Sequence, residues 1–370
     1  MGNEERTENS LIHNLRSTLR LLLEEGGPGF CQFAISNACN ARCGFCGFAL
    51  DKLPQKERKY VPLEGALKAV EILSRHGVRY LEIDGGEPLL HRDLEQMIRR
   101  ASSLQMKVLL VTNGFLLYEK TIRRLADAGV TDFIISIDAA TAEQHETNRG
   151  LPGVCQRIRE ANRLISTLKL TSTASTTISR LVDFQALPSF LESLNFSSVT
   201  FSYPLIGLRS NYLGYARSSL IDYNTEELLE LYDKVKSLKK RFHVVNPTPS
   251  LEEAKRFLRD GEQRYPCLAG YKYFYLDWNL DLWRCYNWEK PMCSIFEFDG
   301  SQRVRDGCTE CMIDCFRDAS VLHYVGISLS DAYRSLRSGR PVEAAKAIFC
   351  KGNLGSIRGL LEDLWWIIRI

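Results

Sequence analysis

Two periodicities of apolar residues alternate along most of the chain. Short runs typical of β-strands occupy 29–36, 78–84, 107–112, 132–138, 171–178 and 197–203. Apolar residues at the spacing of amphipathic helices follow over 62–75, 92–104, 117–128, 153–168, 184–194 and 225–240. Strand-then-helix units in succession predict parallel strands with right-handed crossovers. We therefore expect an α/β fold over residues 29–245, a partial (β/α)6 barrel of the TIM type or an open doubly wound sheet. Either fold puts functional sites at the carboxyl ends of its strands.

The two ends of the chain carry a different pattern. Residues 1–28 contain a predicted helix over 11–25 with one apolar stripe, Leu11, Leu15, Leu19 and Leu22. Residues 326–370 form a predicted helical tail with a second stripe, Leu361, Leu364, Trp365 and Ile368. Such stripes can lie on a membrane surface. We favour the alternative that they cover the barrel or form a dimer, because apolar stripes usually belong to a core.

Cysteine usage changes the picture of the region after 245. The chain has 12 cysteines among 370 residues, and most of them gather in two groups. The polar start MGNEERTENS is not a secretory signal, so we expect a reducing, cytoplasmic location and a metal or cluster in place of disulfides. Residues 250–325 combine cysteines and aromatics with little periodicity, which predicts a small metal-stapled domain.

Charge and hydropathy argue against nucleic-acid binding and against a membrane-spanning helix. The net charge of +3 and the absence of a dense basic tract give no case for nucleic-acid binding. The sequence contains no apolar run of about 18 or more residues, so no membrane-spanning helix is expected. Neither observation speaks against a small-molecule or lipid substrate, which we expect.

The first cysteine group follows the first predicted strand. Cys39, Cys43 and Cys46 have the spacing C-x3-C-x2-C. Three thiolates can ligate three irons of a [4Fe–4S] cluster and leave the fourth iron open to a substrate. Structural zinc and buried free thiols are the alternatives, but structural zinc takes four protein ligands. The spacing favours the cluster.

This loop resembles the signature of the radical S-adenosylmethionine (SAM) superfamily, in which an aromatic residue precedes the third cysteine. Phe45 stands in that position, and the resemblance implies that it packs near the adenine of SAM. The likeness covers about residues 29–205. It implies a [4Fe–4S] cluster and SAM as cofactors, and a reducing partner such as flavodoxin or ferredoxin.

Later strand ends carry motifs that match this superfamily in order. Strand 78–84 ends in Asp84 and the run Gly85-Gly86-Glu87-Pro88. A glycine pair allows a close backbone approach, although an ordinary turn would have the same sequence. The resemblance implies that this loop binds the methionine amino group, with Glu87 pairing with it or orienting the backbone.

Two further turns extend the match. Strand 107–112 leads to Asn113, and strand 132–138 ends in Ser136-Ile137-Asp138, followed by His145 and Arg149. The resemblance implies that Ser136 contacts the cofactor and that Arg149 pairs with its carboxylate. Taken alone, His145 and Arg149 would read as the start of a surface helix.

The second cysteine group lies near the C-terminus. Cys267 and Cys285 flank a predicted hairpin, and Cys308, Cys311 and Cys315 follow. The layout resembles the auxiliary-cluster regions called SPASM and twitch, with zinc as the alternative occupant. It lacks the C-x2-C-x5-C-x3-C element, and Leu280 stands where the family has glycine. We expect one auxiliary cluster on Cys267, Cys285, Cys308 and Cys311, with Cys315 or Cys293 as rivals for a place.

The resemblance implies reductive cleavage of SAM to a 5′-deoxyadenosyl radical that abstracts hydrogen from a biosynthetic substrate. We favour an oxidation assisted by the auxiliary cluster. One alternative is radical addition with carbon–carbon bond formation on a lipid, because the run 308–321 resembles part of the hopanoid-linked adenosyl transferases. A non-catalytic iron–sulfur or zinc scaffold is the other. The sequence offers no candidate for a catalytic acid or base.

Overall fold

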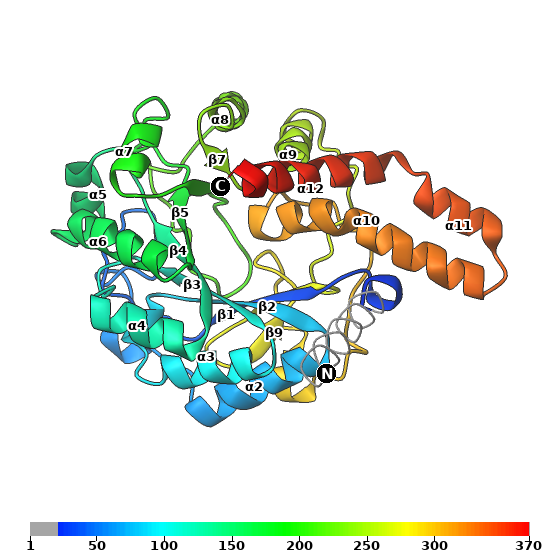
Figure 1. Ribbon diagram of the computed structural model, residues 1–370, viewed down its shortest axis with the longest axis horizontal. Coiled ribbons are helices and arrows are strands. Elements are labelled where there is room, and N and C mark those ends of the chain that lie inside the picture. The colour runs from blue at the N-terminus through cyan, green and yellow to red at the C-terminus, as the bar shows by residue number, and fades with distance from the viewer. Residues whose placement is uncertain (1–20, 370) are drawn as a thin grey trace, which may run out of the picture.

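A single ten-stranded sheet organises the protein (Figure 1). The computed structural model describes residues 21–369, with side chains described up to residue 362. The strand order is β10-β9-β8-β1-β2-β3-β4-β5-β6-β7, and strands β1 to β7 lie side by side in sequence order. Every neighbouring pair from β1 to β7 is parallel.

The βα units confirm the expected partial barrel. The strands are β1 (Gly29–Ala34), β2 (Val78–Asp84), β3 (Lys107–Thr112), β4 (Val130–Ser136), β5 (Thr171–Thr177), β6 (Ser198–Ser202) and β7 (His243–Val244). The helices between them are α2 (Leu63–Arg75), α3 (Leu94–Ser103), α4 (Glu119–Ala128), α5 (Ala142–Arg149), α6 (Val154–Thr167), α7 (Leu187–Ser193) and α8 (Thr225–Leu238). In Figure 1 these helices line the outside of the curved sheet.

The two faces of the sheet differ in chemistry because successive side chains of a strand point to opposite sides. On β2, Leu81 and Ile83 are fully buried in the apolar core, whereas Glu82 between them is not part of it. Ala174 on β5 and Phe201 on β6 belong to the same core. The opposite, inner face carries many polar residues and stays partly exposed.

The cysteine-rich region continues the barrel sheet. After α9 (Thr248–Asp260), strand β8 (Tyr273–Leu276) pairs in parallel with β1, and β9 (Asp281–Trp283) and β10 (Cys293–Ser294) follow antiparallel. This confirms the hairpin expected between Cys267 and Cys285. The region 250–325, expected as a separate small domain, therefore shares one sheet and one core with residues 29–245.

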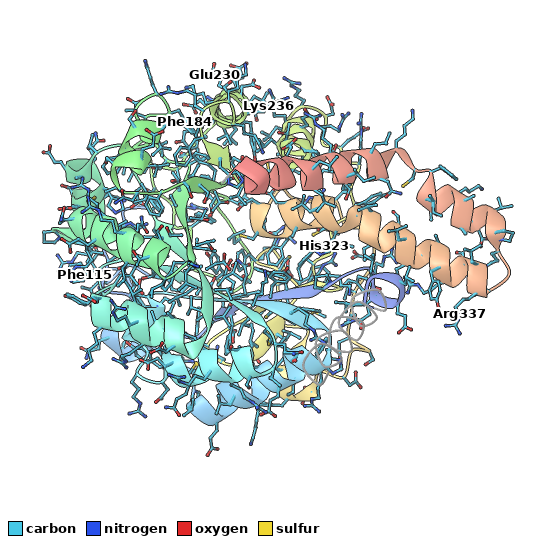
Figure 2. The ribbon with its side chains drawn as sticks, viewed as in Figure 1. Phe115, Phe184, Glu230, Lys236, His323 and Arg337 are labelled. Carbon is cyan, nitrogen blue, oxygen red and sulfur yellow. The ribbon has the colours of Figure 1, made fainter. Side chains whose placement is uncertain are left out.

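Three helices complete the chain. They are α10 (Asp314–Arg337), α11 (Pro341–Ile348) and α12 (Lys351–Arg369), so α10 runs across the expected boundary at 325. Figure 1 shows α10 and α12 side by side, with α11 at the far end. His323 of α10 packs edge-on against Tyr273 of β8, which joins this helix to the sheet (Figure 2).

The end stripes are described only in part. Residues 21–25 are helical, and most of the expected helix over 11–25 lies outside the described residues. Leu361 is 57% exposed, and the side chains of Leu364, Trp365 and Ile368 lie outside the described part. Among the described residues, no helix has the length and apolar character needed to cross a bilayer.

Candidate active site

The first cysteine loop lies at the carboxyl end of β1 and is held from two sides. The backbone amides of Arg42 and Gly44 donate to the carbonyl of Arg149 at 2.8 Å and to the side chain of Asn148 at 3.1 Å, both at the end of α5. On the other side, Gly47 N–H donates to the carbonyl of Leu213 at 2.7 Å. A loop tied in this way presents its cysteines in a fixed arrangement.

The glycine pair after β2 packs directly on this cysteine loop. Gly86 N–H donates to the carbonyl of Ser36, and Glu87 N–H donates to that of Ala38, both at 2.8 Å. A Cβ at Gly85 would overlap the Ser36 carbonyl oxygen, and one at Gly86 would overlap that of Ala38. Gly85 also has φ +125°, which favours glycine. The close approach in this structure is therefore between two loops of the protein.

Glu87 has its hydrogen bonds inside the protein. Its carboxylate accepts from Thr112 Oγ1 at 2.8 Å, from Asn113 N–H at 2.8 Å and from Leu89 N–H at 3.1 Å. Asn113 in turn donates to the side chain of Asn40 in the cysteine loop at 2.8 Å. Glu87 thus ties the ends of β2 and β3 to each other.

Asp138 and Arg149 form a buried ion pair behind the loop. Arg149 Nε and Nη2 donate to the two oxygens of Asp138 at 2.8 and 2.6 Å, and Asn148 adds a third hydrogen bond at 2.8 Å. The backbone amide of Asp138 donates to His145 Nδ1 at 3.0 Å. The expected surface helix start is therefore excluded, because His145 and Arg149 are buried. Arg149 is engaged by Asp138, whereas the resemblance assigns it to the carboxylate of SAM.

The three thiols lie where burial makes the ionised form unfavourable unless a positive charge is nearby. Burial raises the pKa of Cys39 to about 12 and also raises the pKa values of Cys43 and Cys46. The positive charge of Arg149 opposes this rise at all three thiols. Thiols in such a place ionise when irons bind them, because the metal supplies the charge that burial removes. The three side chains also interact electrostatically with one another, so the donor set fits a cluster.

The comparisons with known proteins agree with this geometry. Residues 33–178 match the family described as "Radical SAM superfamily". Residues 33–178 are a radical SAM domain. The match begins on β1 and ends just after β5, so it includes the cysteine loop, the glycine pair and the Asp138–Arg149 pair.

Relatives of known activity share this radical SAM domain. The chain is 29% identical over 154 residues to AdoMet-dependent heme synthase of Methanosarcina barkeri, which is 41% of this chain and 43% of that protein. It is 30% identical over 161 residues to PqqA peptide cyclase of Granulibacter bethesdensis, or 43% of this chain and 42% of that protein. The chain thus spans less than half the length of these relatives.

Solved structures share the fold over a larger part of the chain. SuiB of Streptococcus suis bound to S-adenosylmethionine has a TM-score of 0.56 at 18% identity, covering 79% of this chain and 69% of that one. The protein anSMEcpe with bound AdoMet and a peptide has a TM-score of 0.53 at 14% identity, covering 86% of this chain and all of that one (100%). At these identities the likeness shows the fold, which includes the region after the radical SAM domain.

The remaining motif residues border the same place. Phe45, expected near the adenine, is buried in the core that supports the radical SAM domain, and its carbonyl accepts from Ala216 N–H at 2.7 Å. Pro88 begins a short 3-10 helix after Glu87. Ser136 is the last residue of β4, on its partly exposed face.

Four cysteines gather beside the radical SAM domain. The backbone amide of Cys267 donates to the carbonyl of Cys308 at 2.8 Å. Burial, together with the charges of neighbouring cysteines within this set, raises the pKa of Cys285 to about 12 and that of Cys311 to about 11. Arg284 forms a bidentate pair with Asp306 at 2.6 and 2.7 Å beside them. Cys267, Cys285, Cys308 and Cys311 are thus the set that the fold brings together.

The two rival cysteines have different charged neighbours, although Cys315 packs against the same apolar cluster as the four cysteines. Besides burial, the pKa of Cys315 responds to Asp314, Glu82 and Asp84, so this thiol faces the inner side of the sheet. Cys293 is on β10, where its acidic neighbours are Glu297, Asp299 and Asp281. Cys31 and Cys155, expected as ordinary thiols, are buried, and Cys350 is half-buried. All 12 cysteines are free of disulfides.

Within the described side chains, no group of three or more His, Cys, Asp or Glu residues converges closely enough to hold a single metal ion. Thiolates of a four-iron cluster bind different irons, so they do not have to converge on one point.

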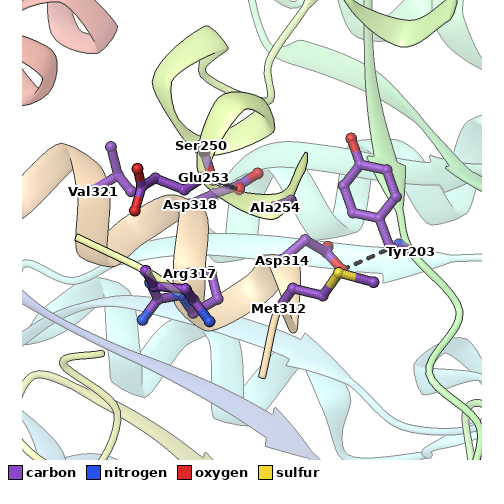
Figure 3. A pocket seen from close by; sticks show the side chains of 10 residues that line it. Tyr203, Ser250, Glu253, Ala254, Met312, Asp314, Arg317, Asp318 and Val321 are labelled. Atoms are coloured by element: carbon purple, nitrogen blue, oxygen red, sulfur yellow. Dashed lines mark hydrogen bonds between the residues drawn. The ribbon is translucent and has the colours of Figure 1, made fainter. Parts of the chain in front are cut away.

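A small cavity lies beside the first turns of α10, lined by Asp314, Arg317 and Val321 among others (Figure 3). It measures about 10 Å³, room for about one water molecule. Asp314, which accepts from Tyr203 N–H at 3.2 Å, lines it together with Asp318 and Arg317. Burial raises the pKa of Asp314 to about 8 and that of Asp318 to about 6. Asn246 donates to Asp318 at 2.8 Å, so these groups join α10 to the end of the barrel.

Sequence reasoning missed the polar residues on the inner face of β1 and β2. Gln32, Glu82 and Asp84 alternate with Phe33, Leu81 and Ile83, which belong to the apolar core. The signal was present as two acidic residues on either side of the buried Ile83. A parallel strand covered by helices on both faces would not carry them.

Proposed function

We propose that this protein is a radical SAM enzyme in which Cys39, Cys43 and Cys46 hold a [4Fe–4S] cluster. The observation that carries the proposal is the fixed, buried cysteine loop at the end of β1, packed on the Gly85–Gly86 turn. When bound, the cluster supplies one electron that cleaves SAM and begins radical chemistry on a substrate. The chain's own part is to hold the loop, place Arg149 beside the thiols and exclude water.

We assign a second cluster to Cys267, Cys285, Cys308 and Cys311. Support comes from their mutual electrostatic interaction. One apolar cluster, which includes Tyr286 and Trp278, contains Cys267 and Cys285, and Cys39, Cys46, Cys308, Cys311 and Cys315 pack against it. A second cluster in contact with the same packed residues favours an oxidation, in which it would serve as electron acceptor when bound.

The proposal includes the partners expected from the sequence. The reductant would be a protein such as flavodoxin or ferredoxin in the cytoplasm. Radical addition to a lipid remains the alternative reaction, which mass spectrometry distinguishes: addition leaves the deoxyadenosyl group on the product, whereas oxidation releases 5′-deoxyadenosine.

The test is iron, sulfide and SAM cleavage after anaerobic reconstitution. Wild type should hold two clusters and cleave SAM with a chemical reductant. The triple variant Cys39→Ala, Cys43→Ala, Cys46→Ala should keep one cluster and lose cleavage. In that background Cys285→Ala should remove the remaining iron, while Cys293→Ser, the matched control, should retain it. Zinc in place of iron in the triple variant would contradict the second cluster, and cleavage of SAM by the triple variant would contradict the first.

A further inference from the structure

The inner face of the barrel is polar near the carboxyl ends of β4, β5 and β6. In the parallel register, Ser136 lies beside Ser175, and Ser175 lies beside Thr200. Thr177 and Ser202 form the next such pair towards the carboxyl ends. All five residues are only half-buried, whereas their neighbours on the helix face are buried. Hydroxyl groups that solvent can reach inside a barrel suit a substrate that forms hydrogen bonds.

Two carboxyl groups stand at one end of this face without a cationic partner. Glu82 and Asp84 are two residues apart on β2, so they point to the same side. Glu82 accepts from Gln32 Nε2 at 2.8 Å, and Oδ1 of Asp84 is buried with no hydrogen-bond partner. Among the described side chains, neither carboxyl forms a salt bridge with a lysine, arginine or histidine. Buried carboxylates need a proton or a cation to offset the loss of water.

A second, independent observation comes from the neighbouring strand. Tyr275 of β8 is fully buried, and its hydroxyl has no hydrogen-bond partner. Tyr275 lies opposite Gln32 in the register, and its pKa is raised by burial and further by the charge of Asp84. The Tyr275 hydroxyl and the Asp84 oxygen, both buried and without a hydrogen-bond partner among the described residues, leave hydrogen-bonding capacity for a donor from outside the protein.

Aromatic rings complete the wall beside these carboxyls. The rings of Tyr212 and Tyr286 stack with centroids 3.7 Å apart, and Tyr275 meets Tyr286 edge-on at 5.0 Å. Tyr286 also donates to Gln32 Oε1 at 2.8 Å, so the wall is joined to the acidic pair. Aromatic rings and carboxylates together favour ammonium groups, the rings through cation–π attraction and the carboxylates through charged hydrogen bonds.

We propose that Glu82, Asp84 and Tyr275 bind a protonated amino group of the substrate, and that the hydroxyl groups of β4, β5 and β6 bind its polar remainder. The inference rests on the proposed function, which places the substrate at the carboxyl ends of the strands. It selects a hydrophilic amine over a lipid. The ammonium could belong to a small amino-polyol or to a lysine side chain of a peptide, and the test separates these two sources.

The experiment measures binding to the reconstituted protein with SAM present, by saturation-transfer NMR. The probes are D-glucamine and sorbitol, which differ by one amino group in place of a hydroxyl. A second pair is Nα-acetyl-lysine amide and Nα-acetyl-norleucine amide. We expect the amine of at least one pair to bind about ten-fold or more tightly than its neutral partner. The pair that shows the difference identifies the source of the ammonium group.

Isosteric variants test the assigned residues. Glu82→Gln and Asp84→Asn should each reduce amine binding about ten-fold, and the exposed Glu119→Gln on α4 is the matched control that should not. SAM affinity by calorimetry should stay within about two-fold in all three variants. Equal binding of amine and neutral probes, or binding that survives both changes, would overturn the inference. A loss of SAM affinity in Asp84→Asn would also overturn it, because the carboxyl would then serve the cofactor.

These results are separate from those that test the proposed function. Wild-type protein that fails to cleave SAM would contradict the proposed function. Amine binding that depends on Glu82 and Asp84 can be measured without any turnover.

Discussion

Arg149 makes two hydrogen bonds to Asp138, at 2.8 and 2.6 Å, and both side chains are buried directly behind the cysteine loop. Burial alone would raise the pKa of Asp138, but Arg149, His145 and the hydrogen bonds outweigh it and lower that pKa. The pair also brings a positive charge close to the three thiols. One ion pair thus supports the loop mechanically and electrostatically.

Arg149→Met should destabilise the protein by about 3–5 kcal/mol, because it leaves the Asp138 carboxylate buried without its partner. The double variant Asp138→Leu, Arg149→Met should recover part of that loss, since no buried charge then remains. Arg123→Met, which removes an exposed i,i+4 pair on α4, is the control and should cost about 1 kcal/mol or less. Apparent thermal unfolding of the metal-free protein measures all three. A double variant less stable than Arg149→Met would contradict the argument.

Gly86→Ala should prevent normal packing of the cysteine loop. Its Cβ would overlap the Ala38 backbone, which cannot move aside as a flexible side chain can. We expect a loss of roughly 1–3 kcal/mol or more in stability, and loss of iron from the first cluster. Gly153→Ala, with open space around its Cβ, is the control, and its cost should be limited to about 1–2 kcal/mol from its φ of +76°. Full iron content and stability in Gly86→Ala would refute the packing argument.

Leu280 combines strain with useful packing. It has φ +67° in the turn between β8 and β9, the position where the related auxiliary-cluster regions have glycine. Its side chain is 6% exposed and lies against Gly65 of α2. Leu280→Ala loses the packing and keeps the strain, at a cost of about 2–5 kcal/mol. Leu280→Gly loses the packing but relieves about 1 kcal/mol of strain. The glycine variant should therefore have a higher melting temperature than the alanine variant, which is the reverse of the order in a regular strand. A lower melting temperature for the glycine variant would show that the turn is not strained.

His145 should make stability depend on pH between about 6.5 and about 4. Burial lowers its pKa from 6.5 to about 4, so the unfolded chain binds the extra proton first. The contribution of neutral His145 to the free energy of unfolding is fully present above pH 6.5 and is lost as the pH falls towards 4. The full loss is about 3 kcal/mol. His145→Asn, which offers a side-chain oxygen to the Asp138 amide, should flatten this part of the profile. Acid groups with raised pKa values, Asp314 and Asp318, act in the opposite direction, so the difference between wild type and variant is the quantity to measure. Parallel profiles would contradict the assignment.

The sequence by itself determined the order of strands and helices and the local loops that follow them. These features depend on residues that are neighbours in the chain. The alternation of Leu81, Glu82 and Ile83 predicts a strand, and Cys39, Cys43 and Cys46 lie within one short loop. The sequence also predicted the hairpin between Cys267 and Cys285, because two short antiparallel strands need only a local turn to pair.

Only the tertiary structure decided which distant groups meet. Cys311 and Cys315 are four residues apart, yet the first turn of α10 begins between them and turns Cys315 towards β1 and β2. The partner of Arg149, the contact of Gly86 with Ala38 and the placing of Glu82 and Tyr275 on either side of Gln32 each depend on the register of neighbouring strands and on how the loops fold over their ends. Residue spacing along the chain carries no information on such contacts, because they are set by the packing of elements that are far apart in the sequence.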